Sequence, residues 1–147
     1  MKHPYRMAAR LAAASVLLAS VAHAAAQEID VYKRTTCGCC AKWVEHLRSN
    51  GFTPHVHELE DIDPIKHKLG VAPELSSCHT AQIGGYVIEG HVPADLIRKL
   101  LKEHPDARGL AVPSMPAGAP GMEGASKMAY DVLLIKRDGT YSLYAHR

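Results

Sequence analysis

The segment Thr36-Cys37-Gly38-Cys39-Cys40-Ala41-Lys42-Trp43 places three of the chain's four cysteines within four positions. Apolar residues then recur at the i, i+3, i+4 and i+7 spacing of one buried helix face, at Cys40, Trp43, Val44 and Leu47. This pattern predicts a loop that turns into a helix at the cysteines. Cys40 is expected on the core face, Cys39 about 100° round the helix from it, and Cys37 on the loop. Because a helix N-terminus favours negative charge, these are predicted to be reactive or metal-binding thiols.

Outward from this segment, strand and helix patterns alternate along the chain. Short alternating or β-branched runs predict strands at 28–33, 52–57, 80–83, 86–89, 130–136 and 140–144. Amphipathic spacing and capping residues predict helices from the cysteines to residue 49, over 63–69 and over 93–103. Residues 104–124 show no periodicity and predict a long loop rich in proline and glycine. These patterns predict an α/β fold, a mixed sheet flanked by helices and closed by a C-terminal hairpin.

The first 26 residues have the features of a secretory signal peptide. Lys2, Arg6 and Arg10 precede an apolar run over 11–21, and small residues follow at 22–26. The run is too short to span a bilayer, although an uncleaved anchor is the alternative interpretation. The sequence therefore predicts a signal peptide at 1–26 and a single domain at 27–147. We expect export to the periplasm and no membrane insertion after cleavage.

Removal of the signal peptide changes the charge balance of the protein. The first 26 residues hold three of the 17 Lys and Arg and none of the 15 Asp and Glu, so the remainder carries 14 basic and 15 acidic side chains. No run of Lys and Arg in the remainder is longer than a pair. A nucleic-acid binder needs a basic excess to contact phosphates. We therefore expect no nucleic-acid partner.

The four cysteines leave several interpretations open. An exported protein with four cysteines commonly carries two disulfides, but a bond between adjacent Cys39 and Cys40 would be strained. Cys37 and Cys40 have the spacing of a redox-active C-x-x-C, which favours an oxidoreductase with Cys37 as the attacking and Cys40 as the resolving thiol. Crowded thiolates also favour copper, since soft sulfur ligands select Cu(I) and can bridge several ions. Zinc is the less favoured metal because adjacent cysteines close a tetrahedral site awkwardly.

Histidines extend the set of candidate ligands. His79 follows Cys78 directly and either binds a metal or orients a neighbouring ligand. His55 and His57 share one face of a predicted strand that contains a proline, so the solvated face of an edge strand is the preferred interpretation for them. His91, like His55 and His57, ranks below His79 as a candidate ligand.

Two methionines, Met115 and Met122, are the only large apolar side chains of the long loop after Val112. Two interpretations are equally favoured. Methionine fills irregular gaps and can pin a loop to the core. Thioethers are also soft ligands that suit Cu(I), and the loop would then serve as a lid over the metal.

The order of strands and helices resembles the thioredoxin and glutaredoxin fold. Val31-Tyr32 running into Cys37-Gly38-Cys39-Cys40 and the later Gly84-Gly85 hairpin carry this resemblance. One departure is the segment Ser77-Cys78-His79-Thr80, which lacks the cis-proline that the superfamily places there. The resemblance implies a thioredoxin-like, more narrowly glutaredoxin-like, fold in which Cys78 lies across from the other three cysteines.

The chain resembles more closely the CopG-type proteins, small exported proteins found with bacterial copper-resistance systems. The motifs that carry the resemblance are distinctive and cover nearly all of 27–147: 36–40, Trp43-Val44, 77–80, 86–93, 109–113, Met115-Pro116 and 120–123. The resemblance implies a thioredoxin-like protein that binds copper through Cys37, Cys39, Cys40 and Cys78.

These inferences predict a periplasmic copper-binding protein of a copper-resistance or homeostasis system. We expect it to bind several Cu(I) ions on a cysteine-thiolate site and to interact with other periplasmic copper-export proteins. Cycling of the metal between Cu(I) and Cu(II), and the alternative of a periplasmic thiol-disulfide oxidoreductase using Cys37 and Cys40, stay open.

Overall fold

The computed structural model describes residues 27–147 of the 147-residue chain. The predicted signal peptide at 1–26 lies outside the described residues. The elements follow in the order β1 (Gln27–Arg34), α1 (Gly38–Ser49), β2 (Phe52–Leu59), α2 (Asp63–Lys68), a 3-10 turn (Pro73–Leu75), β3 (His79–Ile83), β4 (Tyr86–Glu89), α3 (Ala94–Glu103), β5 (Gly109–Ala111), β6 (Asp131–Ile135) and β7 (Tyr141–His146). Over residues 27–147, no helix is long and apolar enough to cross a membrane.

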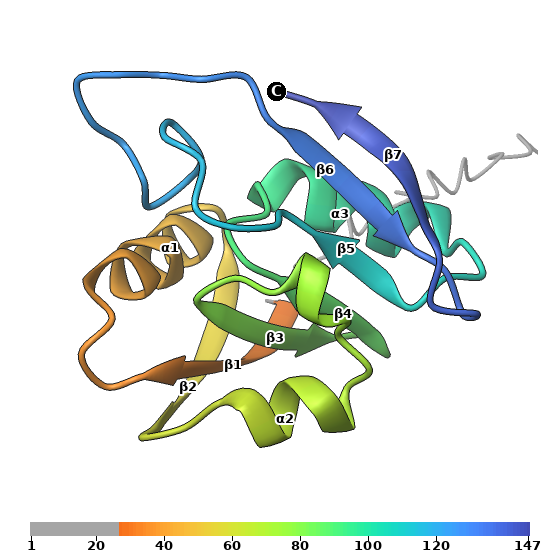
Figure 1. Cartoon of the computed structure of the whole chain (residues 1–147). Coiled ribbons are helices and arrows are strands. Elements are labelled where there is room, and N and C mark those ends of the chain that lie inside the picture. Colours follow the sequence, from red (N-terminus) through yellow and green to blue (C-terminus); the bar gives the residue numbers. More distant parts are fainter. Residues whose placement is uncertain (1–26) are drawn as a thin grey trace, which may run out of the picture.

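A seven-stranded sheet runs through the molecule in the order β2-β1-β3-β4-β5-β6-β7 (Figure 1). The β1–β2 and β4–β5 pairs are parallel, and the other four neighbouring pairs are antiparallel. The predicted α/β class, with a mixed sheet flanked by helices and a C-terminal hairpin, is confirmed. The narrower thioredoxin-like assignment stays a prediction.

The main core lies between α1, α3 and one face of the sheet. The helix stripe predicted from the cysteine segment is fully formed, because Cys40, Trp43 and Leu47 are all 0% exposed. Leu96, Ile97 and Leu100 of α3 join the same cluster, together with Ile88 of β4 and Leu110 of β5. Burial of this much apolar surface is the dominant stabilising term in a domain of this size. It also fixes the N-terminus of α1, with its cysteines, against the sheet.

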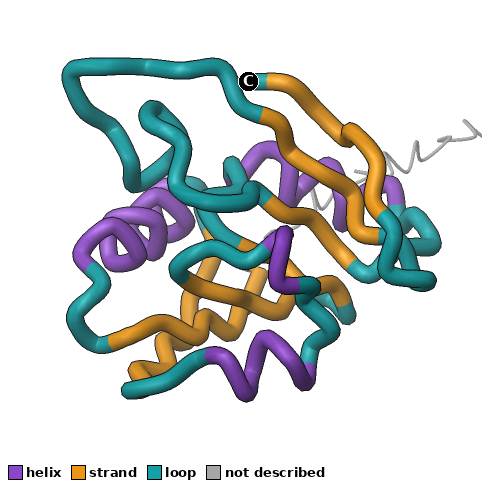
Figure 2. The backbone as a smooth tube through the Cα atoms, viewed as in Figure 1, coloured by secondary structure: helices purple, strands orange, loops and turns teal. Residues whose placement is uncertain are grey.

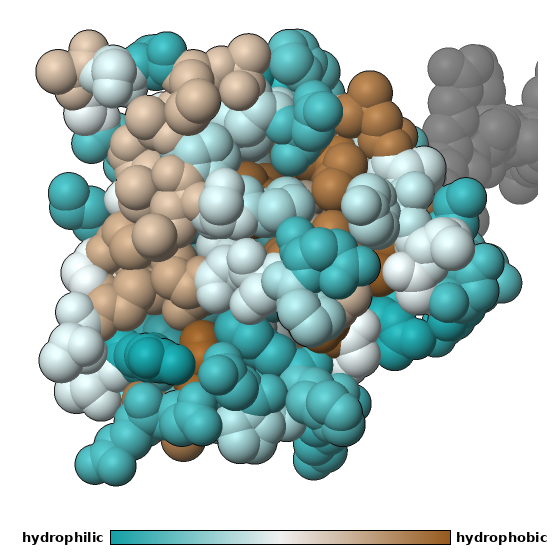
Figure 3. All heavy atoms as spheres, viewed as in Figure 1, coloured by the Kyte–Doolittle hydropathy of each residue, from teal (hydrophilic) through white to brown (hydrophobic). Residues whose placement is uncertain are grey.

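The opposite face of the sheet is covered by the segment that contains α2 and the 3-10 turn. A smaller apolar cluster forms there from Val71, Leu75, Val87, Ala111 and Ile135. Side chains alternate along β4 because successive strand residues point to opposite faces. Val87 therefore belongs to the small cluster and Ile88 to the main core. In the view of Figure 3, hydrophilic residues predominate around α2, whereas moderately hydrophobic residues gather on the side of α1 and the long loop.

The loop predicted at 104–124 contains a strand that the sequence pattern did not indicate. β5 spans only three residues and is buried throughout between β4 and β6. It therefore shows no alternation of polar and apolar residues and is too short to be recognised as a strand from the sequence. A side chain at Gly109 would overlap the Val87 carbonyl, and glycine permits this close approach of two backbones. The true loop runs from residue 112 to 130 and passes over α1 (Figures 1 and 2).

Candidate metal centre

The N-terminus of α1 presents three cysteines, and two of them are joined. Cys37 is the residue that caps the helix, and its sulfur accepts a hydrogen bond from the Cys40 backbone N–H at 3.3 Å. A disulfide links Cys37 to Cys40, with their Cα atoms 5.3 Å apart. Cys40 is fully buried, whereas Cys37 and Cys39 are half-buried at the surface of the site. The predicted arrangement, one cysteine tucked in and two facing outward, is therefore present.

Cys78 faces these cysteines from the segment that leads into β3. The Cys39 sulfur lies 3.5 Å from the Cys37 sulfur and 3.7 Å from the Cys78 sulfur. All four sulfur atoms lie within 4.8 Å of one another. Cys39 and Cys78 are free thiols. The structure thus brings together the four cysteines that the resemblance implied as ligands, while ligation itself stays a prediction.

Two buried histidines complete the site on the side of Cys78. The Cys78 sulfur lies 3.1 Å from His91 Nε2 and 3.4 Å from His79 Nδ1. The His79 ring packs against Trp43 with ring centroids 4.3 Å apart, and the His91 ring meets His79 edge-on. His91 Nδ1 is 2.8 Å from the Pro120 carbonyl oxygen, to which it donates a hydrogen bond. The three residues form a second group of closely spaced ligand atoms that shares Cys78 with the sulfur cluster.

His91, which sequence reasoning ranked below His79 as a ligand, lies beside Cys78 in the structure, and the sequence contained a signal for this contact. In the β3–β4 hairpin, Thr80 pairs with Glu89 about the Gly84-Gly85 turn. Two further steps in this antiparallel register bring Cys78 opposite His91. The predicted hairpin was therefore enough to place the two side chains together. His55 and His57, by contrast, lie on the edge strand β2 beside Glu28 and Asp30, as the preferred interpretation expected.

Burial sets the protonation of the three residues around Cys78. Burial first, and the neighbouring Cys39 second, raise the pKa of the Cys78 thiol to about 12. Burial lowers the pKa of His79 well below its usual range; His91 and Lys66 add to this shift and the Gly90 backbone opposes it. Burial also lowers the pKa of His91, against the effect of its hydrogen bond to Pro120. At neutral pH the site thus holds a thiol and two neutral imidazoles, so a metal ion must displace the thiol proton.

The loop over α1 is fixed to the site at several points. Ser77 Oγ donates to the Ser114 carbonyl, and the Ser114 N–H donates to the Ser76 carbonyl. At Gly121, φ is +86° and an added Cβ would lie 2.8 Å from Cys39 O and from Trp43 N. With the His91 bond to Pro120, these contacts hold the loop against the cysteines.

The two methionines of the loop differ in position. The Met115 sulfur lies 4.0 Å from the Cys39 sulfur, and the Met115 side chain is 50% exposed. Met122 is half-buried, and among the residues described no hydrogen-bonding contact joins its sulfur to a cysteine. Of the two predicted soft ligands, the structure therefore brings Met115 to the sulfur cluster.

A buried charge network stands behind Cys78 and His79. The Glu89 carboxylate is fully buried and accepts hydrogen bonds from the Ser77 backbone N–H, the Thr80 hydroxyl and the Lys66 ammonium group. Lys66 also donates to the Thr80 hydroxyl at 2.8 Å. Ser77 and Thr80 flank the Cys78-His79 pair in the chain. The network therefore fixes the backbone on both sides of two candidate ligands.

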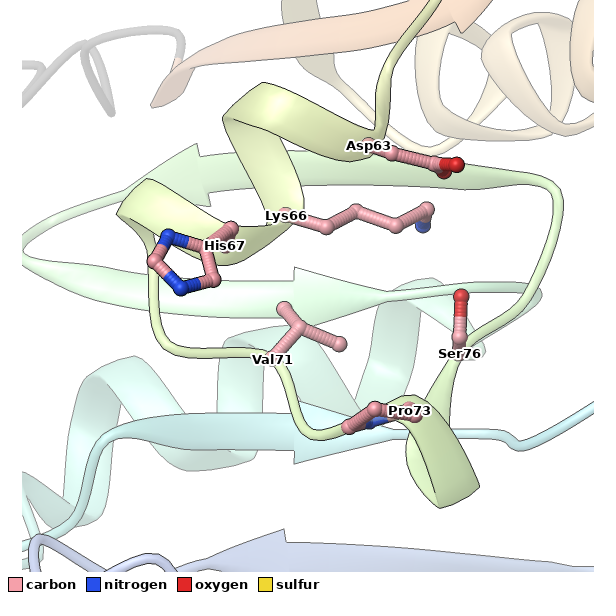
Figure 4. A pocket seen from close by; sticks show the side chains of 6 residues that line it. All are labelled: Asp63, Lys66, His67, Val71, Pro73 and Ser76. Carbon is pink, nitrogen blue, oxygen red and sulfur yellow. The ribbon is translucent and has the colours of Figure 1, made fainter.

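Two cavities meet at Lys66. The larger, about 410 Å³, lies beside α2 and is lined by Asp63, Lys66, His67, Val71, Pro73 and Ser76, with the lysine chain extended toward the space between Asp63 and Ser76 (Figure 4). The smaller, about 240 Å³, shares Asp63 and Lys66 with the first and is also lined by Cys37 and Cys78. The larger cavity has no sulfur in its lining, so only the smaller one borders the candidate metal centre.

The donor set fits a soft metal ion. Four sulfurs from cysteine, two imidazole nitrogens and one thioether are the ligand types preferred by copper, and carboxylates are absent from both groups of ligand atoms found in residues 27–147. With Cys37 and Cys40 bonded to each other, the disulfide must be reduced before all four sulfurs can act as thiolates.

Comparisons with known proteins point the same way. Residues 75–122 match a family model described as a protein of unknown function, DUF411. Two solved structures, described as copper resistance protein CopG in form 2 and form 1, are each 45% identical to this chain, with TM-scores of 0.79 and 0.78. Each match covers 83% of this chain and 98% of the solved chain. The comparison with curated proteins finds no match. On this identity and coverage, the chain belongs to the CopG family of copper resistance proteins.

Proposed function

We propose that this protein binds Cu(I) on the thiolates of Cys37, Cys39, Cys40 and Cys78 as part of a copper-resistance or homeostasis system. The observation that supports the proposal is the convergence of four cysteine sulfurs within 4.8 Å of one another. Thiolates at this spacing can bridge more than one Cu(I) ion. His79 and Met115, both in contact with a cysteine of the cluster, are proposed as additional ligands.

The proposed setting is the periplasm. The signal-like segment at 1–26 supports export, and residues 27–147 would then act as one metal-binding domain. Cu(I) would be received from, or passed to, other periplasmic copper-export proteins. Met115 is suited to be the first ligand that an incoming Cu(I) ion contacts, because its side chain is half-exposed and its sulfur lies beside Cys39. Met122 is less well placed than Met115 to be a ligand, and it is proposed only as part of the loop that covers the site.

A thiol-disulfide oxidoreductase is the second candidate, favoured by the Cys37–Cys40 disulfide at the N-terminus of α1. Cys37 is half-buried and lines the smaller cavity, whereas Cys40 is fully buried. An incoming thiolate would therefore attack Cys37, breaking the disulfide and releasing Cys40 as a thiolate at the helix N-terminus. In the reverse direction Cys37 would attack a substrate disulfide and Cys40 would resolve the mixed disulfide.

An anaerobic Cu(I) titration of fully reduced residues 27–147 tests the proposal. We expect more than one Cu(I) per chain to be retained against a competing Cu(I) chelator, and Cys78→Ser to lose most of this copper. His55→Ala is the matched control, because His55 is exposed on the edge strand β2 and should leave the copper content unchanged.

Two outcomes would contradict copper binding. Loss of all copper to the chelator would remove the proposal, and equal retention of Zn(II) would make zinc the better assignment. If copper is lost and the protein turns over a disulfide substrate in a manner that requires Cys37, the oxidoreductase becomes the function.

A further inference from the structure

The two outermost strands of the sheet differ in how they are protected against further pairing. β2 and β7 each have one side without a neighbouring strand among residues 27–147. β2 contains Pro54, which has no backbone N–H, and the charged Glu58, and both features discourage the addition of a strand. The sequence of β7, YSLYAH, contains no proline, lysine or acidic residue. The β7 side of the sheet is therefore the one open to another strand.

Apolar side chains on one face of β7 are exposed. Leu143 pairs with Leu133 of β6, and Tyr141 pairs with Ile135. Ile135 belongs to the small apolar cluster on the α2 side of the sheet and is 1% exposed, whereas Leu143 is 62% and Tyr141 47% exposed. In Figure 3, strongly hydrophobic residues reach the surface over the β6–β7 hairpin. The small cluster thus continues outward along the sheet and, within residues 27–147, ends uncovered at β7.

The same residues carry the backbone groups that point away from the sheet. The Lys136 N–H donates to the Thr140 carbonyl at 2.8 Å, so these two residues form a hydrogen-bonded pair next to the β6–β7 turn. Hydrogen bonding alternates along an antiparallel strand. Ser142 therefore also faces β6, whereas the N–H and C=O groups of Tyr141 and Leu143 face outward. A further strand at this edge would bind the backbone of the two residues whose side chains are most exposed.

A second copy of β7 matches this pattern. With a twofold axis at Ser142, Tyr141 of one copy lies opposite Leu143 of the other, and the reverse pair is formed on the far side of the axis. Because both residues face outward, each pair exchanges two backbone hydrogen bonds. Each tyrosine ring then packs across the strands against a leucine, which is a favourable cross-strand contact. The surface is thus complementary to itself.

The charges at the ends of the hairpin favour the antiparallel arrangement. Lys136, Arg137 and Asp138 are exposed at the turn, and Asp131 and His146 are exposed and paired at the open end. A parallel arrangement of two copies would bring each end beside itself, where like charges repel. The antiparallel arrangement instead brings each turn, with its two basic residues, beside the open end of the other copy, which carries Asp131.

We propose that β7 is a self-association surface, which pairs antiparallel with β7 of a second copy about a twofold axis at Ser142. The pairing extends one sheet across two molecules and covers Tyr141 and Leu143 of both. None of the candidate metal ligands lies on β7, and β5 and β6 separate this strand from the β3–β4 hairpin. The metal centres of the two copies would therefore both stay accessible.

Sedimentation velocity of residues 27–147 measures the association. Cys39 and Cys78 are alkylated first, so that no disulfide can join two chains. An interface one strand wide is small, so we expect a reversible dimer between about 5 and about 500 µM. Leu143→Lys introduces the residue that natural edge strands use against pairing and should weaken the dimer at least about tenfold. Thr53→Lys, the same addition of charge on the exposed part of β2, is the matched control and should leave the dimer unchanged.

A cysteine at the axis tests the register. The Cα atoms of the two Ser142 residues, as a non-hydrogen-bonded pair, would lie about 4.5 Å apart, which a disulfide can span. Mild oxidation of Ser142→Cys should therefore join two chains at this position, as peptide mass spectrometry can identify. Thr140→Cys lies two residues from the axis, where the two Cα atoms would be about 14 Å apart, and it should form no such bond.

Three results would overturn the proposal. The first is a single monomer mass over the whole concentration range. The second is a dimer that Leu143→Lys leaves intact, because the interface would then lie elsewhere. The third is growth beyond the dimer, since a twofold contact closes on itself. The copper titration has no bearing on these results, so this inference and the proposed function can fail separately.

Discussion

The Glu89 carboxylate accepts a hydrogen bond from the Ser77 backbone N–H at 2.6 Å, immediately before Cys78 in the chain. Glu89 lies on β4, and two residues later the chain reaches His91. One fully buried carboxylate thus connects the backbone that carries Cys78 with the strand that leads to His91. Its only cationic partner, among residues 27–147, is the nearly buried Lys66.

Replacement of Glu89 by Gln is expected to destabilise the protein by about 3–5 kcal/mol, because Lys66 would keep a buried charge without its counterion. Urea unfolding at neutral pH measures the change. Glu74→Gln, an exposed carboxylate on the 3-10 turn, is the control and should stay within about 0.5 kcal/mol. Adding Lys66→Met to Glu89→Gln should restore part of the loss. An unchanged free energy of unfolding for Glu89→Gln alone would show that the pair contributes little.

Gly121→Ala is expected to lift the long loop from α1. The new Cβ would collide with Cys39 O and Trp43 N at a residue whose φ is +86°. We expect the free energy of unfolding, measured by thermal unfolding, to fall by about 1–3 kcal/mol, and the free Cys39 thiol to be alkylated faster. Gly124→Ala makes the same chemical change in the same loop but meets nothing within 4 Å, and it should alter neither quantity. Equal effects of the two substitutions would rule out a specific contact at Gly121.

The two methionines should differ in their effect on copper. Met115→Leu removes the thioether beside Cys39 and is expected to weaken Cu(I) retention about tenfold, the order seen for groups that support a metal site. Met122→Leu should leave it unchanged. Chelator competition with the reduced protein compares them directly. If the pair of substitutions together leaves copper affinity as it was, the methionines only hold the loop.

Acid should weaken the contact between α1 and α3 through His46. Burial lowers the pKa of His46, and its Nε2 accepts a hydrogen bond from the Ala94 backbone N–H at 3.1 Å. A lowered pKa means that folding favours the neutral ring, so this stabilisation is complete above the unfolded pKa of about 6.5 and is lost as the pH falls through the folded value. The difference in free energy of unfolding between the metal-free protein and its His46→Gln variant should therefore shrink as the pH falls from about 7.5 to about 5. A difference that stays constant with pH would exclude His46 as the titrating group.

The parts of the fold that depend on local pattern could be predicted from the sequence. The Cys40-Trp43-Val44-Leu47 stripe fixed the buried face of α1, and Asn50-Gly51 marked its end. The Gly84-Gly85 turn marked the β3–β4 hairpin, and Asp138-Gly139 marked the β6–β7 hairpin. Each of these signals lies within a few residues of the structure it specifies, which is why no knowledge of the rest of the chain was needed.

The remaining features depend on contacts between distant segments. β5 gave no periodic signal because it is short and buried on both faces. Lys66 and Glu89 would each be expected at the surface, and their burial is explained by their mutual contact together with the hydrogen bonds that they share with Thr80. The spacing of four cysteines permits three pairings, so the Cys37–Cys40 bond could not be derived from sequence alone.

Trp43 is the only tryptophan of the chain, is fully buried, and lies with its ring 4.3 Å from the ring of His79. Its indole N–H donates to the Val92 carbonyl, so the ring has one fixed orientation beside the candidate metal ligands. Copper bound at such short range quenches indole emission. If the proposed site binds copper, Trp43 would be an intrinsic fluorescent reporter of its occupancy, and the rate at which copper enters or leaves could be timed on the unlabelled chain.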